Sequence, residues 1–268
     1  MDIIQVFVTN WDEIHSLAKR GWLYRGQKSA KWPLQTSLDR CCAHHNVAEA
    51  DRPRIEHELF REFRRTYHQY SHHIPEASSE LEWMSLMQHH GAPTRLLDFT
   101  YSIYVAAYFA LENSDDAAAV WACNGPWALK ESLAKFEQAK KQNVNRLNEP
   151  FIEDHERLLS PILFKEPYVR AVCPLNPFRL NERLRVQKGA FLVPGDITAS
   201  FADNLKALSG FDSAEHLIKI VIPHNIRAQA LKQLFYMNIS RTSLFPGLDG
   251  FAHSLGVYHP AFDPVTWV

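Results

Sequence analysis

The chain has 268 residues, of which 46% are hydrophobic and 22% are charged; this composition is typical of a globular protein and excludes a largely disordered one. The 29 Lys and Arg residues balance 30 Asp and Glu residues, so net charge alone neither requires nor excludes a polyanionic partner. The four cysteines show no CxxC spacing, which argues against a disulfide framework and fits a reducing compartment. The sequence has no run of about 18 apolar residues and no secretory leader pattern. We expect a cytoplasmic protein without a membrane partner.

The first half of the chain has mainly helical patterns. Thr9 or Asn10 can cap a helix that runs to about Lys19, and the aromatic stretch after Gly21 indicates a strand at 22–25. Apolar residues at helical spacing predict three further helices, at 51–70, 80–90 and 103–112. The face of the 51–70 helix opposite its apolar residues is crowded with Arg and His. We interpret that basic face as solvated in preference to ligand-binding.

The second half has mainly strand-like patterns. We expect strands in the apolar runs at 117–123, 168–175, 189–194 and 216–223, followed by helices at 225–236 and within 244–255. Helices first and strands later favour an α+β fold. The segment from Trp127 to about Glu149 is charged and rich in Gln and Asn. We therefore expect one domain over 1–268, with an insertion or surface arm at 127–165.

The stretch QHHGAPTRLLDFT at 88–100 gathers several polar residues at a helix end. The side chains of successive residues on a helix diverge by about 100°, so His89 and His90 cannot easily bind one metal ion together. The residues of CCAHH at 41–45 are also neighbours in sequence and are poorly placed to bind one ion together. We expect no metal site. Gly91 and Pro93 have the pattern of a helix stop. Arg95 next to Leu96 needs either a carboxylate partner or a ligand, and both interpretations stay open.

Several enzyme classes lack their motifs in this sequence. There is no G-x-S-x-G elbow, no P-loop and no G-x-G-x-x-G fingerprint. Cys123 and Cys173 lie in apolar strand-like runs, where inert core thiols are common. Serine hydrolase, NTPase, kinase and Rossmann dehydrogenase chemistry are therefore not expected.

Three ordered blocks nevertheless resemble one family. They are WLYRGQ, SLMQHHGAPTRLLDFTYSIYVAAYFALE, and RVQKGAFLV followed by SRTSLFPGLDGFA, and together they span about 20–255. This arrangement resembles the FRG domain family, named for an aromatic-Arg-Gly motif that is Tyr24-Arg25-Gly26 here. The middle block is the most specific, and the residues that match its family form are Gln88, His89, Gly91, Pro93, Thr94, Arg95, Asp98, Thr100 and the 106–110 helix.

The order of the blocks also resembles that of ADP-ribosyltransferases, which implies a mixed or antiparallel β core behind a largely helical N-terminal half. In that family an arginine grips the phosphates of NAD, which matches Arg25, and a Ser or Thr supports the nicotinamide ribose, which matches Thr100. A later strand carries a catalytic glutamate, but this sequence has Gln187 there. Glutamine offers no negative charge, and loss of such a preorganised group costs about 3 kcal/mol. Either another acid such as Asp98 then supplies the charge, or the catalytic mechanism differs, or the protein only binds its ligand.

The resemblance implies catalytic and ligand-binding roles for one set of residues. The expected catalytic residues are Arg25, His89, Asp98 and Gln187, and the expected ligand-binding residues are Tyr24, Arg25, Gly26, Gln88, Arg95 and Thr100. His89 can handle a proton, since the pKa of histidine lies near physiological pH, or it can simply pin the helix end.

The implied function is that of an enzyme that consumes NAD and transfers ADP-ribose to a nucleic acid or protein, as a bacterial toxin or phage-defence effector. The alternative is a non-catalytic module that binds a nucleotide or nucleic acid in the same pocket, which the missing glutamate favours. A metal-dependent hydrolase that uses His44, His45, His89 and His90 is a distant third interpretation. The expected partners are a nucleotide-type small molecule and an acceptor macromolecule.

Overall fold

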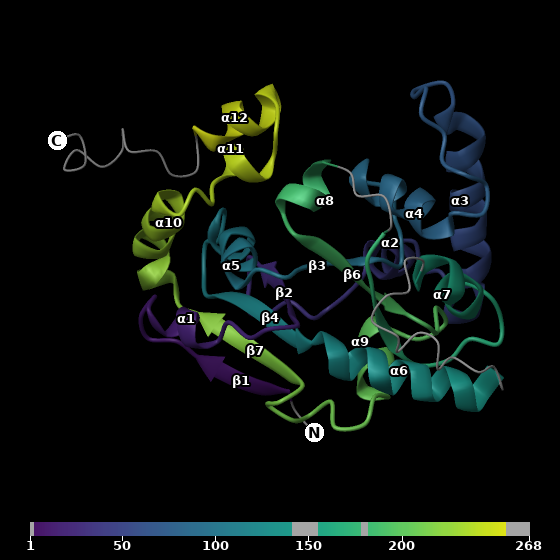
Figure 1. The fold of residues 1–268 in the computed structure, drawn as a ribbon, viewed down its shortest axis with the longest axis horizontal. Coiled ribbons are helices and arrows are strands. Elements are labelled where there is room, and N and C mark those ends of the chain that lie inside the picture. Colours follow the sequence, from purple (N-terminus) through teal and green to yellow (C-terminus); the bar gives the residue numbers. More distant parts are fainter. Residues whose placement is uncertain (1–2, 141–154, 178–181, 256–268) are drawn as a thin grey trace.

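The computed structural model describes residues 3–140, 155–177 and 182–255. A seven-stranded mixed sheet runs through the molecule, with helices on both faces (Figure 1). Its strand order is β1-β7-β4-β2-β3-β6-β5, and only β1 and β7 among these strands pair in parallel. The strands are β1 (Ile4–Phe7), β2 (Trp22–Gln27), β3 (Leu97–Thr100), β4 (Ala118–Asn124), β5 (Val172–Leu175), β6 (Gly189–Pro194) and β7 (Leu217–Ile222). The predicted combination of helices with a mixed sheet is confirmed.

The strands predicted from apolar runs lie where the sheet is buried on both faces. β4 and β7 are central, and their side chains are almost all buried, which is why they appear as near-continuous apolar runs. β1 was not predicted, because it is a short edge strand whose side chains are mostly exposed. It is held by a parallel register in which Ile4 lies opposite Ile218.

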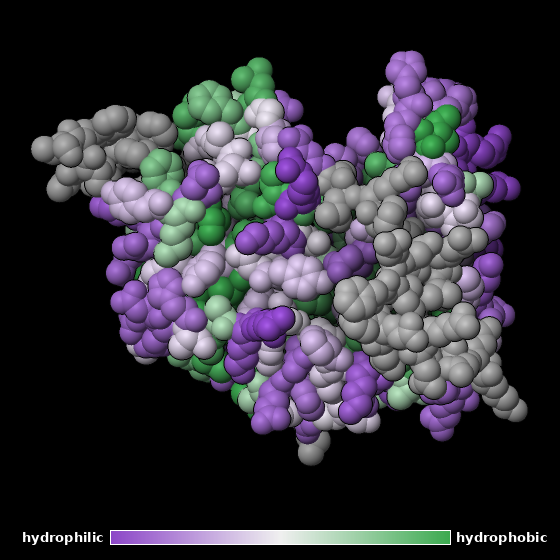
Figure 2. Space-filling model, viewed as in Figure 1, coloured by the Kyte–Doolittle hydropathy of each residue, from purple (hydrophilic) through white to green (hydrophobic). Residues whose placement is uncertain are grey.

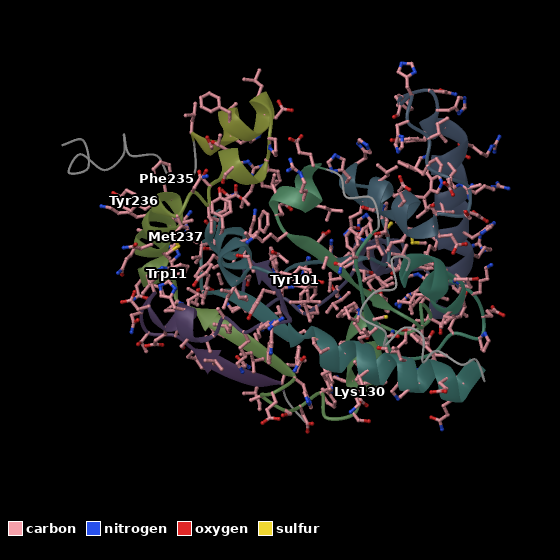
Figure 3. The ribbon with its side chains drawn as sticks, viewed as in Figure 1. Trp11, Tyr101, Lys130, Phe235, Tyr236 and Met237 are labelled. Atoms are coloured by element: carbon pink, nitrogen blue, oxygen red, sulfur yellow. The ribbon has the colours of Figure 1, made fainter. Side chains whose placement is uncertain are left out.

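One face of the sheet is covered by α1 (Glu13–Ser16), α5 (Ile103–Leu111) and α10 (Arg227–Tyr236). The hydroxyl of Ser102 accepts a hydrogen bond from the amide of Val105, so the predicted cap of α5 is present. Trp11 is buried in the same apolar cluster, whereas Tyr236 on α10 is exposed (Figure 3). The helix predicted at 11–19 is shorter in the structure, because the Tyr24 hydroxyl binds the carbonyl of Leu17 and the amide of Lys19.

The other face is covered by the longer helices. These are α3 (Arg52–Tyr67), α4 (Glu80–His89), α6 (Gly125–Lys140) and α7 (His155–Leu163), and the shorter α2 (Ser37–His44), α8 (Glu182–Val186) and α9 (Phe201–Lys206) lie near them. The chain ends with α11 (Arg241–Leu244) and α12 (Leu248–Ser254). No helix in the described ranges is long and apolar enough to cross a membrane.

The described part of the segment expected as a surface arm contributes to the core. Trp127 and Phe136 on α6, and Leu159 and Leu163 on α7, are buried in the main hydrophobic cluster. Exposure of the kind expected for an arm is therefore not found in these two helices. On α6 the charged side chains of Lys130 and Glu137 are exposed, which accounts for the polar pattern of that segment. Residues 141–154 of the expected arm lie outside the described residues.

Candidate functional site

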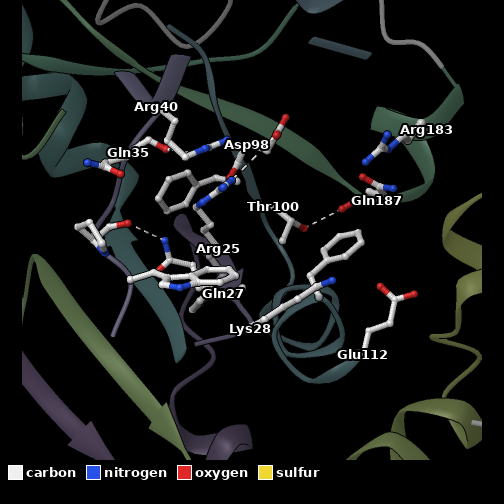
Figure 4. Close-up of a pocket in the computed structure, with 16 residues that line it drawn as sticks. Arg25, Gln27, Lys28, Gln35, Arg40, Asp98, Thr100, Glu112, Arg183 and Gln187 are labelled. Atoms are coloured by element: carbon white, nitrogen blue, oxygen red, sulfur yellow. Dashed lines mark hydrogen bonds and ion pairs between the residues drawn. The ribbon is translucent and has the colours of Figure 1, made fainter. Parts of the chain in front are cut away.

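The sheet opens between β2 and β3. The two strands share a single paired position, Tyr24 opposite Thr100. Beyond it they diverge, and a cavity of about 610 Å³ lies at the opening (Figure 4). Its lining comes from β2, the loop after β2, α2, β3, the end of α5, and α8 with the turn that follows it: Tyr24, Arg25, Gly26, Gln27, Lys28, Trp32, Pro33, Gln35, Arg40, Asp98, Phe99, Thr100, Phe109, Glu112, Arg183 and Gln187. We call this cavity the β2–β3 cleft.

Arg25 bridges the opening with its side chain. Its Nη1 donates to the backbone carbonyl of Asp98 at 2.8 Å and lies 4.0 Å from the nearer carboxylate oxygen of that residue. Its Nε is buried and has no hydrogen-bond partner among the described residues. Burial lowers the pKa of Arg25, while the charge of Asp98 opposes that effect. The guanidinium is thus held in place by the Asp98 carbonyl while one of its donors stays unused.

Positive charge exceeds negative charge in the cleft. Four cationic side chains line it, from Arg25, Lys28, Arg40 and Arg183, against the carboxylates of Asp98 and Glu112. Glu112 is already engaged by Arg241 and by the hydroxyl of Tyr108. Burial lowers the pKa of Arg183, which lies over the ring of Phe245. An anionic ligand would compensate this excess.

Asp98 presents its carboxylate to solvent at the cleft. Its side chain is 57% exposed, and it accepts a hydrogen bond from Nε2 of Gln88 at 3.0 Å. Gln88 also donates to the carbonyl of Leu96 and accepts from the hydroxyl of Thr94. The glutamine therefore fixes the segment between α4 and β3 and orients the carboxylate of Asp98.

Thr100 and Gln187 lie on the side of the cleft opposite Arg40 (Figure 4). The hydroxyl of Thr100 donates to the backbone carbonyl of Gln187 at 2.7 Å and accepts from the amide of Ser102 at 3.0 Å. Gln187 is buried, and its Nε2 donates to the carbonyl of Leu244 at 3.0 Å. Both side chains reach the cleft, but each is already used to join β3, β6 and α11.

Tyr24 and Gly26 flank Arg25 on β2 and have clear structural roles. The hydroxyl of Tyr24 is used by the turn before β2, as described above. A Cβ atom on Gly26 would lie 2.0 Å from the carbonyl oxygen of Ala106 and 2.6 Å from the amide of Ala110. Gly26 therefore allows α5 to pack directly against β2. Their expected contact with a ligand stays a prediction.

His89 lies beside the cleft and not inside it. A small hollow of about 40 Å³ is lined by His89 and Gln88, and shares Asp98, Arg183 and Gln187 with the cleft. Burial, followed by the charges of His90 and Arg183, lowers the pKa of His89. A neutral imidazole next to Asp98 is thus favoured near neutral pH.

Arg95 is not brought into the cleft. Its Nε donates to Oε1 of Glu56 at 2.7 Å, its Nη2 pairs with Oε2, and its Nη1 donates to the carbonyl of Leu163 at 3.1 Å. The side chain is 2% exposed. Of the two interpretations left open by the sequence, the carboxylate partner is the one observed. That partner lies 39 residues away and could not be identified from the local motif.

Several cleft residues were not among the expected site residues, namely Gln27, Lys28, Trp32, Gln35, Arg40, Phe109, Glu112 and Arg183. Glu112 is the last residue of the middle motif block and Arg183 lies two residues before the third block, so charge at the ends of the motifs was a usable signal. Trp32 is 52% exposed at the rim, which is unusual for tryptophan. Gln27 accepts from the indole of Trp121 and donates to the carbonyl of Pro33, and so fixes the loop after β2.

Metal-ligating and nucleophilic side chains do not gather in this cleft. Across the described ranges, no three His, Cys, Asp or Glu side chains lie together as possible ligands of one ion. All four cysteines are free thiols. Burial raises the pKa values of Cys123 and Cys173 to about 12, so both thiols stay protonated and unreactive at neutral pH.

Residues 20–119 match the family model of the FRG domain. The match contains Tyr24-Arg25-Gly26, the 88–100 block and all of α5, whereas the RVQKGAFLV and SRTSLFPGLDGFA blocks lie outside it. Comparisons with curated proteins and with solved structures found no match. β2, β3 and α5, which form three sides of the cleft, therefore come from the matched segment. The resemblance to the FRG domain family inferred from the sequence is thus confirmed over residues 20–119.

Proposed function

We propose that the β2–β3 cleft binds NAD and that the protein transfers ADP-ribose from it to a nucleic acid or protein. The observation that carries this proposal is Arg25, a partly buried guanidinium beside an opening in the sheet, whose Nε has no hydrogen-bond partner among the described residues. A planar guanidinium fork suits a diphosphate, and Arg25 is positioned by the Asp98 carbonyl before any ligand arrives.

The size and charge of the cleft support a nucleotide-type ligand. Its volume of about 610 Å³ lies within the range of small-molecule sites. Arg40 and Arg183 add positive charge on two sides of Arg25, and the exposed ring of Trp32 at the rim offers a stacking surface. A nucleotide could place its phosphates on Arg40 and Arg183 and stack its planar base on the ring of Trp32.

NAD supplies a glycosidic bond that breaks with its electron pair moving to the nicotinamide nitrogen, while the acceptor forms the new bond to the sugar and releases a proton. The chain has to stabilise the positive charge that develops on the sugar. Asp98 is the exposed carboxylate of the cleft and is oriented by Gln88, so it suits that role. His89, neutral and adjacent, suits acceptance of the proton.

The alternative is a module that binds the nucleotide without chemistry. It is favoured by the hydrogen bonds of Thr100 and Gln187, whose donor groups are already committed to the carbonyls of Gln187 and Leu244. In this alternative the arginines hold the phosphates as described, and Asp98 serves only to orient Arg25.

The two candidates separate in one pair of measurements on the purified chain. Calorimetric titration with NAD and with ADP-ribose measures binding, and chromatography measures nicotinamide release in the presence of cell lysate. We expect Arg25→Ala to weaken binding of both ligands at least about tenfold, a loss of about 1.4 kcal/mol. Arg54→Ala is the matched control, because Arg54 is exposed on α3 and pairs only with Glu58.

For an enzyme, Asp98→Asn should reduce nicotinamide release about a hundredfold or more, while the dissociation constant of NAD changes less than about threefold. Binding without any nicotinamide release by the wild-type chain would support the module instead. If neither NAD nor ADP-ribose binds at millimolar concentration, both candidates are wrong.

A further inference from the structure

A second cavity of about 740 Å³ lies between α3, α4 and the segment at 164–168, and it shares no lining residue with the β2–β3 cleft. Its floor is the ion pair of Arg95 and Glu56. The guanidinium of Arg95 lies over the rings of Phe164 at 5.2 Å and Tyr168 at 6.0 Å. The floor is therefore electrically neutral and fixed, and its walls are aromatic.

Arg64 is positioned at this cavity without a carboxylate. Its guanidinium carbon lies 5.4 Å from the ring of Phe60 and 5.2 Å from the ring of Trp83, and no carboxylate of the described ranges lies within ion-pair distance. Arg61, one helical turn earlier and exposed, likewise has no carboxylate partner among the described residues. Arg65, by contrast, pairs with Glu62 on the surface at 3.6 Å.

The charges at this cavity therefore do not balance. Four arginines and two glutamates line it, and Glu56 is already neutralised by Arg95. Burial raises the pKa of Glu80, and the positive charges of Lys165, Arg95 and Arg64 oppose that shift, so the second glutamate faces several cations. Two arginines with free donors next to an aromatic wall are the groups that recognise a phosphate joined to a planar base.

A basic stripe of α3 runs along the cavity. His57, Arg61, Arg64 and His68 recur at helical spacing on the side that lines the cavity. At 1.5 Å per residue this stripe is about 16 Å long, several times the spacing of successive phosphates in a strand. Figure 2 shows hydrophilic residues gathered over α3 at the outer edge of the molecule. A basic stripe of this length can contact more than one phosphate.

We propose that this second cavity binds a nucleotide unit, with its base against the ring of Phe60, Phe164 or Tyr168 and its phosphate on Arg61 and Arg64. The length of the basic stripe favours a single-stranded nucleic acid as the source of that unit over a free nucleotide. The inference is independent of NAD and of the β2–β3 cleft, because the two cavities have no residue in common.

The test measures fluorescence anisotropy of a labelled single-stranded RNA octamer and of the DNA octamer of the same sequence, titrated with the full chain over a series of salt concentrations. Unlabelled AMP and UMP serve as competitors. The variants are Arg61→Ala, Arg61→Ala/Arg64→Ala, the matched control Arg54→Ala on the same helix, and Arg25→Ala in the other cavity. Arg61 is exposed, so the single variant keeps its fold even if removal of Arg64 disturbs the ring of Trp83.

We expect the double variant to weaken octamer binding at least about tenfold, and the slope of log affinity against log salt to fall by about 0.7 for each arginine removed. Arg54→Ala and Arg25→Ala should stay within about twofold of wild type. Displacement of the octamer by AMP or UMP at millimolar concentration would support a free-nucleotide ligand, and absence of displacement would support a strand. The proposal is overturned if no probe binds at low salt, or if Arg54→Ala or Arg25→Ala weakens binding as much as Arg61→Ala does.

Discussion

Two arginines of the protein, Arg95, which is buried, and Arg25, which is partly buried, differ in how their guanidinium groups are satisfied. Arg95 has both arms of its guanidinium on Glu56 and a third bond to the Leu163 carbonyl, so its charge and its donors are satisfied inside the chain. Arg25 donates one hydrogen bond to the Asp98 carbonyl and lies 4.0 Å from the Asp98 carboxylate. Its buried Nε has no hydrogen-bond partner among the described residues. The first is an element of the fold, and the second is available to a ligand.

The contrast teaches that burial and motif membership do not identify a binding arginine. Both residues lie in motif blocks, and both are next to apolar neighbours. What separates them is whether another part of the chain supplies a carboxylate, and only Arg95 has one at full hydrogen-bond contact. The predictions below test this division, beginning with the largest effect.

Arg95→Met should destabilise the fold by about 3–5 kcal/mol, because it leaves the Glu56 carboxylate buried without a partner. Urea unfolding monitored by circular dichroism measures the change. The double variant Arg95→Met/Glu56→Leu should recover most of the loss, since an apolar pair carries no desolvation penalty. If the single variant costs less than about 1 kcal/mol, Arg95 is not the structural element described here.

Gly26→Ala tests whether the neighbour of Arg25 acts through packing. The added Cβ would meet the backbone of α5 at 2.0 Å, so the helix would have to separate from β2, at a cost of about 3 kcal/mol or more. Gly91→Ala is the comparison, because Gly91 has a φ of +83° and open space around its Cβ position. It should cost only about 1–2 kcal/mol in the same unfolding experiment. Equal losses would contradict a packing role for Gly26.

Arg25→Met should change the free energy of unfolding by less than about 1 kcal/mol, in contrast to Arg95→Met. The lost bond to the Asp98 carbonyl is offset by removal of a buried, partly unpaired cation. Urea unfolding at low and high salt gives the value. A loss as large as that of Arg95→Met would show that the fold, and not a ligand, is the partner of Arg25.

The smallest expected effect is a pH dependence at the edge of the cleft. The pKa of His89 is lowered in the folded chain, so between the folded value and the unfolded value of about 6.5 the unfolded chain binds the extra proton. Stability from this group is therefore complete above pH 6.5 and falls as the pH decreases. The drop in thermal midpoint from pH 7.5 to 5.5 should be smaller in His89→Gln than in wild type, and unchanged in His72→Gln, which lies on an exposed loop.

The sequence predicted the helices and strands that are determined by their own residues, such as a capping side chain or a run of apolar residues. The hydroxyl cap at Ser102, the small residues of α5 and the apolar runs of β4 and β7 were sufficient to place them. β1 and α2 were missed, because a short exposed strand and a short polar helix have weak patterns of their own. The strand order could not be predicted, since β1 pairs with β7 across more than 200 residues.

In the candidate site, too, the motifs indicated which residues lie near one another but not which partners they have in distant segments. Of the residues that the motifs were expected to bring together, Arg25, Asp98, Thr100 and Gln187 line one cleft, with Tyr24 and Gly26 beside Arg25. Gln88 and His89 line the adjoining hollow, and Arg95 lines the separate cavity at α3. The placement of Arg95 depended on Glu56, which lies on a different helix and in no motif. The hydrogen bonds that commit Thr100 and Gln187 are likewise formed with segments distant in sequence. Binding by these residues remains a prediction.

The strand order also shows that the segment similar to the FRG domain family is shorter than the segment needed to complete the sheet. The matched segment ends at residue 119, but β2 needs β4 as its neighbour, β3 needs β6, and β4 in turn needs β7. A fragment cut at the end of the match would carry two strands with bare edges, which invite intermolecular pairing and aggregation. Experiments on this cleft therefore require the chain at least as far as β7, more than twice the length that sequence similarity delimits.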